Sequence, residues 1–242
     1  MRWGKSYCRS GRREVLQEQV AIVPAAMDVR RFPDYYRAYV WSDTHGLSGY
    51  PPDQYPAFEW IKSLEKRFLH YRSDPEVTPL FLIREMIQWG GSQNGVLEKF
   101  DNALGTHCLQ TKLDSVLGSL RIPRDAIKSA LDIPGLGLTY ASKLLRFLDP
   151  ERYGALDGRI RKALGKIDPS PIPKVFDGNK PNMASGYCIF TEYVESLRRE
   201  LSAKSIPFPS EGSCAQQVWQ AADVEMALFH WASSQEDDLA IS

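Results

Sequence analysis

The segment Ile-Pro-Gly-Leu-Gly at positions 133–137 constrains the fold more than any other part of the chain. A helix that begins at Pro123 precedes this segment, and a second helix with apolar residues three and four positions apart follows it. Proline restricts one backbone φ angle, and the two glycines permit positive φ angles and close backbone approach. The sequence therefore predicts two helices joined by a tight turn, with the small residue Ala141 where they meet. The apolar residues of the second helix are Leu138, Ala141, Leu144, Leu145 and Leu148.

The same turn predicts an anion-binding site made of backbone groups. The second helix begins with N–H groups that lack a partner within the helix, and with the positive end of its dipole. Gly135 and Gly137 carry no side chain that would block access to these donors. Such a site suits a phosphate group. A plain helical hairpin with a glycine-rich connection remains the alternative interpretation.

Helical periodicity dominates the remainder of the chain, so we expect an all-α protein with eight or nine helices. Helices are predicted over 57–72, 78–89, 185–203 and 215–232. Thr78 is the expected N-cap of the second of these, and Pro79 lies in its first turn. Loops are predicted over 42–56, 168–181 and 206–213. The short apolar run at 20–23 is compatible with an edge strand or with no regular element.

Composition argues against several classes of protein. The 242 residues are 43% apolar and 25% charged, which is typical of a folded globular chain and not of a disordered one. Because the chain has neither 18 consecutive apolar residues nor an apolar stretch near its start, we expect a cytoplasmic protein without a membrane partner. The four cysteines and four histidines are scattered, without a Cys-X-X-Cys pair, which argues against a zinc site or an iron–sulfur cluster.

The net charge is zero, but the charge is unevenly distributed along the chain. Residues 121–166 contain ten basic and five acidic side chains, an excess of five positive charges. A locally basic surface is what contact with phosphate requires. Solvated faces of helices are the alternative interpretation of the same charges.

The segment 133–137 with its flanking helices resembles the helix–hairpin–helix DNA-binding motif. Asp157 lies twenty residues after Gly137, within the sequence Leu-Asp-Gly-Arg-Ile. Together the two features resemble the helix–hairpin–helix–Gly/Pro–Asp superfamily of DNA glycosylases. The resemblance covers residues 121–166 and implies two helical lobes with double-stranded DNA across the cleft between them. One lobe would comprise residues 76–153, and the other would be discontinuous, formed by residues 1–75 and 154–242.

The resemblance implies base-excision chemistry, as in DNA repair, centred on Asp157. Its carboxylate would stabilise the oxocarbenium-like sugar and activate water, while the base is extruded from the duplex. Thr139 stands where lyase members carry a nucleophilic lysine, which implies a monofunctional enzyme that hydrolyses the N-glycosidic bond. Lys143, one turn later, is expected to lie on the surface or to contact phosphate. The expected DNA-binding residues are Pro134, Gly135, Gly137, Ser142, Lys143 and Arg159, with Arg161 as a further candidate.

An extruded base needs aromatic or apolar partners, and the gap in the duplex needs a wedge. The candidates are Trp89, Gln93, Asn94, Tyr140 and Trp219. Large aromatic residues are more often part of a core than of a pocket, so a structural role is the alternative for the aromatic candidates. The resemblance also implies a monovalent cation bound by backbone carbonyls at Ile133 and Leu136, and a monomeric enzyme.

Two other functions remain open at this point. One is a helix–hairpin–helix module that binds DNA without catalysis, and the other is a glycosylase with lyase activity that uses a non-standard lysine. The identity of the excised base also remains open. Oxidised guanine, alkylated purines, mismatched bases and the modified bases of foreign DNA are all compatible with the sequence.

Overall fold

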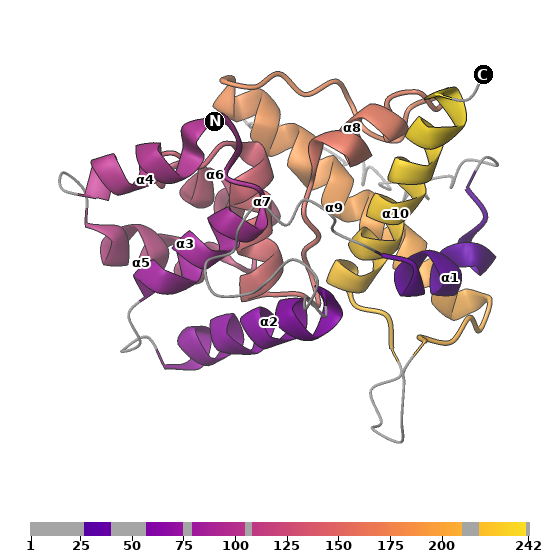
Figure 1. The fold of residues 1–242 in the computed structure, drawn as a ribbon, viewed down its shortest axis with the longest axis horizontal. Coiled ribbons are helices and arrows are strands. Elements are labelled where there is room, and N and C mark those ends of the chain that lie inside the picture. Colours follow the sequence, from indigo (N-terminus) through magenta and orange to yellow (C-terminus); the bar gives the residue numbers. More distant parts are fainter. Residues whose placement is uncertain (1–26, 40–56, 75–78, 105–107, 210–217, 241–242) are drawn as a thin grey trace, which may run out of the picture.

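A computed structural model describes residues 27–39, 57–74, 79–104, 108–209 and 218–240 of the chain (Figure 1). These residues form ten α-helices and two short 3₁₀ turns, Val29–Arg31 and Gln93–Gly95, and contain no strand. The predicted all-α class is therefore confirmed for the described part. The helices are α1 (Phe32–Arg37), α2 (Ala57–Ser73), α3 (Pro79–Trp89), α4 (Val96–Leu104), α5 (Leu109–Ser119), α6 (Pro123–Leu131), α7 (Leu138–Leu148), α8 (Gly158–Leu164), α9 (Lys180–Ala203) and α10 (Ala221–Ala240).

Most predicted helices are present, with shifted ends. Helices α2, α3, α6 and α7 match the predicted segments closely. Helix α9 begins five residues earlier than predicted, because the Asn179 side chain accepts a hydrogen bond from the Asn182 N–H at 3.0 Å and Pro181 fits the first turn. Helix α10 begins at Ala221 and not at 215. Thr78, the run 20–23, the segment 42–56 and the end of 206–213 lie outside the described residues.

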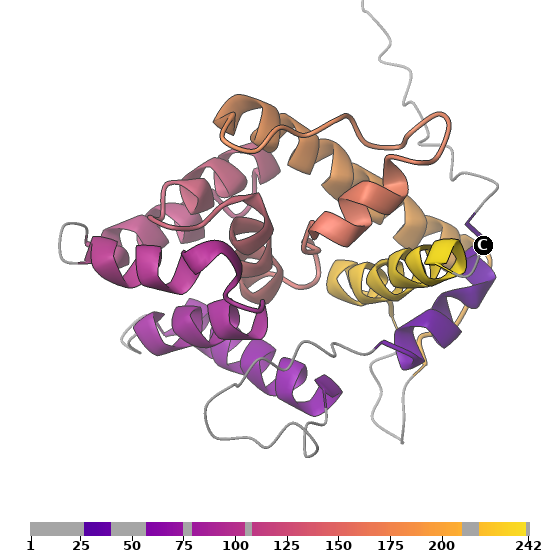
Figure 2. The same ribbon diagram turned by 45° about the horizontal axis from the view of Figure 1, so that its top comes forward.

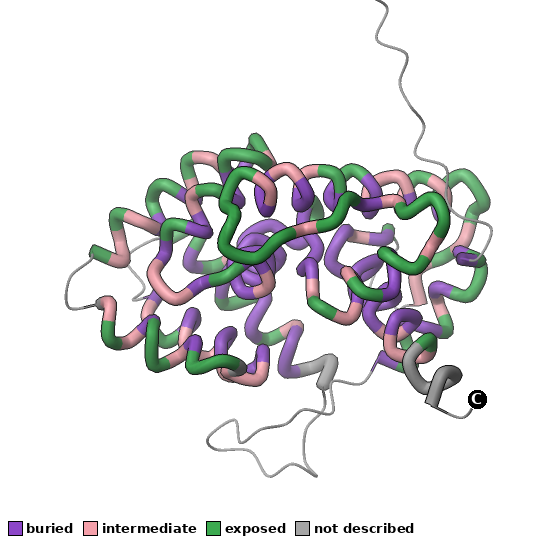
Figure 3. The backbone as a smooth tube through the Cα atoms, turned by 90° about the horizontal axis from the view of Figure 1, so that it is seen from above, coloured by how far each residue is buried: buried purple, intermediate pink, exposed green. Residues whose placement is uncertain are grey.

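Helix α7, the second helix of the hairpin, lies at the centre of the molecule. It packs against α2, α3 and α6, and every residue along it except Thr139 is buried. Figures 1 and 2 show α7 between the α2–α6 side of the molecule and the side that contains α8 and α10. The tube in Figure 3 shows buried residues concentrated between the outer helices. The central helix thus holds Thr139 at its one accessible position.

The helices form two sets of neighbours. In the first set, α7 packs against α2, α3 and α6, while α3 also contacts α2 and α4, and α6 also contacts α5. In the second set, α1, α8 and α9 pack against α10. Contacts between α6 and α9 join the two sets. Helix α2 packs against α3 and α7, so it contacts helices on the other side of the predicted boundary between residues 75 and 76.

Candidate functional site

Three helices position the segment 154–157, which leads into α8. The Tyr187 hydroxyl of α9 donates a hydrogen bond to the carbonyl of residue 154 at 3.0 Å. The Glu225 carboxylate of α10 accepts a hydrogen bond from the N–H of residue 155. The Ser142 hydroxyl of α7 accepts a hydrogen bond from the N–H of residue 156 at 2.9 Å. These bonds from α7, α9 and α10 determine where Asp157 emerges.

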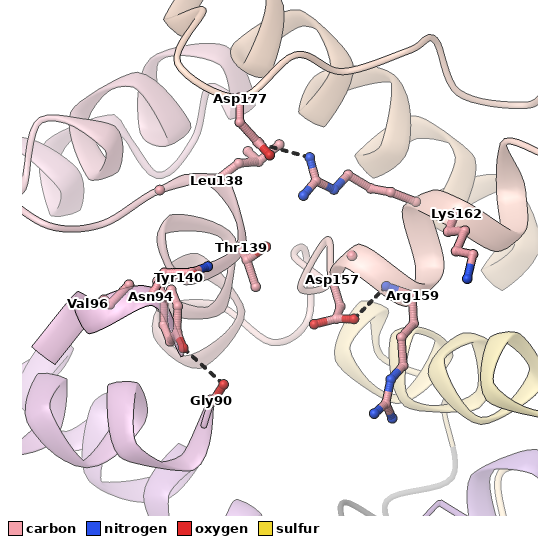
Figure 4. Close-up of a pocket in the computed structure, with 13 residues that line it drawn as sticks. Gly90, Asn94, Val96, Leu138, Thr139, Tyr140, Asp157, Arg159, Lys162 and Asp177 are labelled. Atoms are coloured by element: carbon pink, nitrogen blue, oxygen red, sulfur yellow. Dashed lines mark hydrogen bonds and ion pairs between the residues drawn. The ribbon is translucent and has the colours of Figure 1, made fainter. Parts of the chain in front are cut away.

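Asp157 is the N-cap of α8. Its Oδ1 atom accepts a hydrogen bond from the Arg159 N–H at 2.8 Å, which satisfies one of the unpaired donors of the first turn. The residue is half-buried. Figure 4 shows its carboxylate pointing away from α8 into a pocket, toward the wall that carries Thr139 and Tyr140. The capping bond thus fixes the position of the Asp157 carboxylate and leaves it accessible from the pocket.

The pocket, here called the site pocket, has a volume of about 510 Å³. One wall is the start of α7, a second is the start of α8, and a third comes from the turn after α3. It brings together residues more than eighty positions apart in the sequence. Its lining comprises Gly90, Asn94, Val96, Gly137, Leu138, Thr139, Tyr140, Asp157, Gly158, Arg159, Arg161, Lys162 and Asp177.

The hairpin turn presents the open end of α7 to this pocket. Gly137 is exposed and is the N-cap of α7, and the first bond within the helix runs from the Ala141 N–H to its carbonyl at 2.9 Å. The preceding N–H groups of α7 therefore have no partner within the helix. Gly135 has a φ angle of +80° and packs directly on the backbone of Phe100 in α4. The two glycines thus have different roles: Gly135 allows the turn to pack closely against α4, and Gly137 leaves the N-terminal end of α7 accessible.

Alanine at these two glycines should have different effects. Gly135→Ala places a Cβ 2.8 Å from the Phe100 backbone nitrogen at a positive φ angle, so we expect a loss of about 2–3 kcal/mol of unfolding free energy. Gly137→Ala meets open space and should cost less than about 1 kcal/mol. Urea unfolding of both variants measures the difference. Equal losses for the two variants would contradict these roles.

Two residues predicted to contact phosphate are buried. The side chains of Ser142 and Lys143 lie inside the protein, with exposures of 0% and 2%, and not on the surface where a phosphate contact was predicted. Ser142 instead donates to the Thr139 carbonyl at 2.9 Å while it accepts from the Leu156 N–H. Its hydroxyl therefore bonds both to Thr139 and to Leu156, the residue before Asp157. These two bonds fix the positions of the two candidate catalytic residues relative to each other.

Lys143 lies behind the site pocket. Its ammonium group lies 4.6 Å from the centre of the Trp89 ring and 5.5 Å from that of Tyr140. Burial lowers the pKa of Lys143, and the negative charges of Asp157 and Glu225 oppose that shift. Lys143 therefore lies between the aromatic rings behind the site pocket and the acidic groups of the site.

Arg146 and Glu225 extend this buried charge cluster. The Arg146 guanidinium is fully buried, and lies 3.4 Å from a carboxylate oxygen of Glu225 and 3.4 Å from one of Glu65. Burial raises the pKa of Glu225 to about 7, although the charges of Arg146 and Lys143 lower it. The carboxylate that anchors segment 154–157 therefore titrates near neutral pH.

The stability of the protein should depend on pH through Glu225. Its pKa is about 7 in the folded protein and 4.5 ordinarily, so between these values the folded state keeps a proton that the unfolded chain has lost. Stability from this group is therefore lost as the pH rises from about 5 to 7. We expect Glu225→Gln to gain about 2–3 kcal/mol relative to the wild type between pH 5 and pH 8. Urea unfolding at both pH values measures this gain, and a constant difference between the two proteins would contradict it.

The predicted base-pocket residues are separated in the structure. Asn94, which is exposed and has a φ angle of +59°, and Tyr140, whose hydroxyl donates to the Gly90 carbonyl at 3.0 Å, both line the site pocket. Trp89 is buried between Trp60 and Phe147. The structure does not describe the side chain of Gln93.

Trp219 lies away from the site pocket. Its ring packs edge-on against Tyr36 and Phe208, and its indole N–H donates to the Ile206 carbonyl at 3.1 Å. Trp89 and Trp219 therefore lie in the core, which favours the structural alternative to their predicted role in binding or displacing a base. Each ring packs against two other aromatic rings of the fold, which is typical of large aromatic residues in a core.

Sequence reasoning missed two site residues and one supporting residue. Lys162 and Asp177 line the site pocket, and the Asp177 carboxylate accepts a hydrogen bond from the Arg161 guanidinium at 3.0 Å. Lys162 belongs to the basic segment already identified, so its charge was a usable signal. Asp177 and Glu225 are far from the motif in sequence, and no local pattern connects them to it.

No known family model, curated protein or solved structure matches this chain. Among the described residues, no helix is both long and apolar enough to cross a membrane. In that same part of the chain, histidine, cysteine and carboxylate side chains form no group of three that could hold a metal ion.

Proposed function

We propose that the protein is a monofunctional DNA N-glycosylase that extrudes and excises a damaged or modified base. The observation that carries this proposal is the site pocket, where Asp157 faces the open N-terminal turn of α7. Arg159 and Lys162 line the same pocket. One acid group near backbone donors and cations suits a reaction that builds positive charge on a sugar held by its phosphates.

Asp157 acts on the sugar as the base leaves. When the C1′–N bond breaks, the deoxyribose gains oxocarbenium character, and a carboxylate about 4 Å away contributes about 4 kcal/mol at an effective dielectric near 20. Attraction that develops only in the transition state would accelerate the reaction about a thousandfold. The base leaves with the electron pair of the C1′–N bond and takes up a proton from solvent. The attacking water forms the new C–O bond at C1′ and gives its proton to Asp157, and the Thr139 hydroxyl orients that water.

The hairpin and α8 bind double-stranded DNA on either side of this centre. The open end of α7 at Gly137 offers backbone donors to one phosphate, and Arg159 supplies a cation from α8. Pro134 and Gly135, both half-buried, shape the turn. DNA would then run across a cleft between the two sets of helices, each acting as one lobe of a monomeric enzyme.

A monovalent cation at the hairpin carbonyls belongs to the same proposal. The Ile133 carbonyl already accepts a hydrogen bond from the Leu136 N–H at 3.2 Å, which leaves one lone pair for a cation. Such an ion would supply a positive charge next to the bound phosphate. The fit is compatible with the residues present, and the proposed chemistry does not depend on it.

The proposal is tested with a panel of duplexes that each carry one defined lesion or modification. Each duplex is incubated with the wild type and with Asp157→Asn, and abasic sites are revealed by cleavage in hot alkali. We expect abasic sites for one class of base with the wild type only. DNA binding without abasic sites on any duplex would overturn the enzymatic function and favour a non-catalytic DNA-binding module.

Borohydride trapping tests for lyase chemistry in parallel. Lys143 is buried beneath Trp89 and Tyr140, so we expect no covalent adduct with DNA. An adduct that disappears in a Lys143→Gln variant would overturn the monofunctional assignment.

A further inference from the structure

A second groove adjoins the site pocket on the other flank of α8. It has a volume of about 520 Å³ and lies between α8 and the chain that follows it, up to residue 175. Gly158, Arg161 and Lys162 line both openings. Because these three residues are shared, the two openings adjoin each other at α8. We call the second opening the flanking groove.

The flanking groove is strongly basic. Its lining includes four cationic side chains and no acidic one. Three of them, Lys162, Lys166 and Lys174, are exposed, and Arg161 is half-buried. Lys162 lies in α8 and Lys166 in the turn that follows it, where the Lys166 N–H donates to the Ala163 carbonyl at 3.2 Å, so the two lysines are about one helical turn apart. Arg161 also pairs with Asp177, which is not part of the lining of this groove, and cations gathered on one concave surface attract an anion.

The outer wall of the flanking groove is anchored to the core. Ile172 is buried, and the Phe176 N–H donates to the Asn182 side chain of α9 at 2.6 Å. The Phe176 ring itself is 53% exposed, and the ammonium group of Lys174 lies 5.4 Å from its centre. An exposed ring beside a cation matches the surfaces on which nucleic-acid bases stack while their phosphates are neutralised.

We propose that the flanking groove holds the phosphodiester backbone of the DNA strand next to the extruded nucleotide. Arg161 and Lys162 contact the phosphate at the boundary with the site pocket, and Lys166 and Lys174 contact the phosphates beyond it. The inference rests on the proposed function only in that its ligand is DNA. It adds the course of the strand, which leaves the site along α8 and away from the hairpin.

The salt dependence of DNA binding tests this course. Binding of an unmodified fluorescent duplex is measured by anisotropy between 50 and 200 mM salt for the wild type and for Lys166→Ala/Lys174→Ala. Loss of two phosphate contacts should reduce the slope of log K against log salt by about 1.8, and should weaken binding about 10- to 60-fold near 0.1 M salt. Lys166→Arg/Lys174→Arg should keep the wild-type slope, since it keeps both charges.

The matched control is Lys66→Ala/Lys112→Ala, which removes the same charge from α2 and α5, outside both openings. We expect the wild-type slope from this variant. An unchanged slope in the Lys166/Lys174 variant, or an equal loss in the control, would overturn the proposed course. If the wild type excises no base but the slope still falls, the flanking groove is supported and the glycosylase function fails. If the wild type excises a base and the slope is unchanged, only the groove proposal fails.

Discussion

Asp157→Asn should slow base excision about a thousandfold and leave DNA binding within a few-fold of the wild type. The substitution removes the negative charge that would face the sugar, which is worth about 4 kcal/mol in the transition state. It keeps the shape of the side chain and its role at the start of α8, because asparagine caps a helix as well as aspartate does. Single-turnover kinetics with excess enzyme on the responsive duplex measure the chemical step.

Asp177→Asn is the matched control for this variant. Asp177 is the other carboxylate in the site pocket, 73% exposed and paired with Arg161, so its replacement changes the pocket charge by the same amount. We expect an excision rate within a few-fold of the wild type. An Asp157→Asn rate within tenfold of the wild type, or an equal loss in Asp177→Asn, would refute the assigned role of Asp157.

Arg146→Met should lower the free energy of unfolding by about 3–5 kcal/mol. The Arg146 guanidinium is fully buried and forms ion pairs with Glu65 of α2 and Glu225 of α10. Methionine fills much of the same volume but leaves two buried carboxylates without their shared cation, and removing one partner of a buried pair is strongly destabilising. Urea unfolding at neutral pH measures the loss.

An exposed arginine provides the comparison for Arg146. Arg199 pairs with Glu195 one turn earlier in α9, and its side chain is 75% exposed, so Arg199→Met should cost less than about 1 kcal/mol. Combining Arg146→Met with Glu225→Gln should recover part of the loss, because the second change removes the charge of the buried Glu225 carboxylate. A loss below 1 kcal/mol for Arg146→Met would show that the cluster does not support the fold.

Local sequence was a good guide to the hairpin. The Pro-Gly-Leu-Gly turn predicted both flanking helices, because proline and glycine preferences act over only a few residues. It was a poor guide to the surroundings of α7. Periodicity indicates one buried face, but α7 is enclosed by α2, α3, α6 and segment 154–157, so Ser142 and Lys143 are buried too.

Three features could be predicted from the amino-acid sequence: the all-α class, the turn between α6 and α7, and the acid residue twenty positions after it. These follow from local conformational preference and from spacing along one chain. Three others became visible once the helices were placed in space: Asp157 and Thr139 share a pocket, Glu225 and Lys143 lie behind them, and Trp219 belongs to the core. Such relations depend on how distant helices pack, because burial and charge contacts arise between residues that the chain itself does not hold close together.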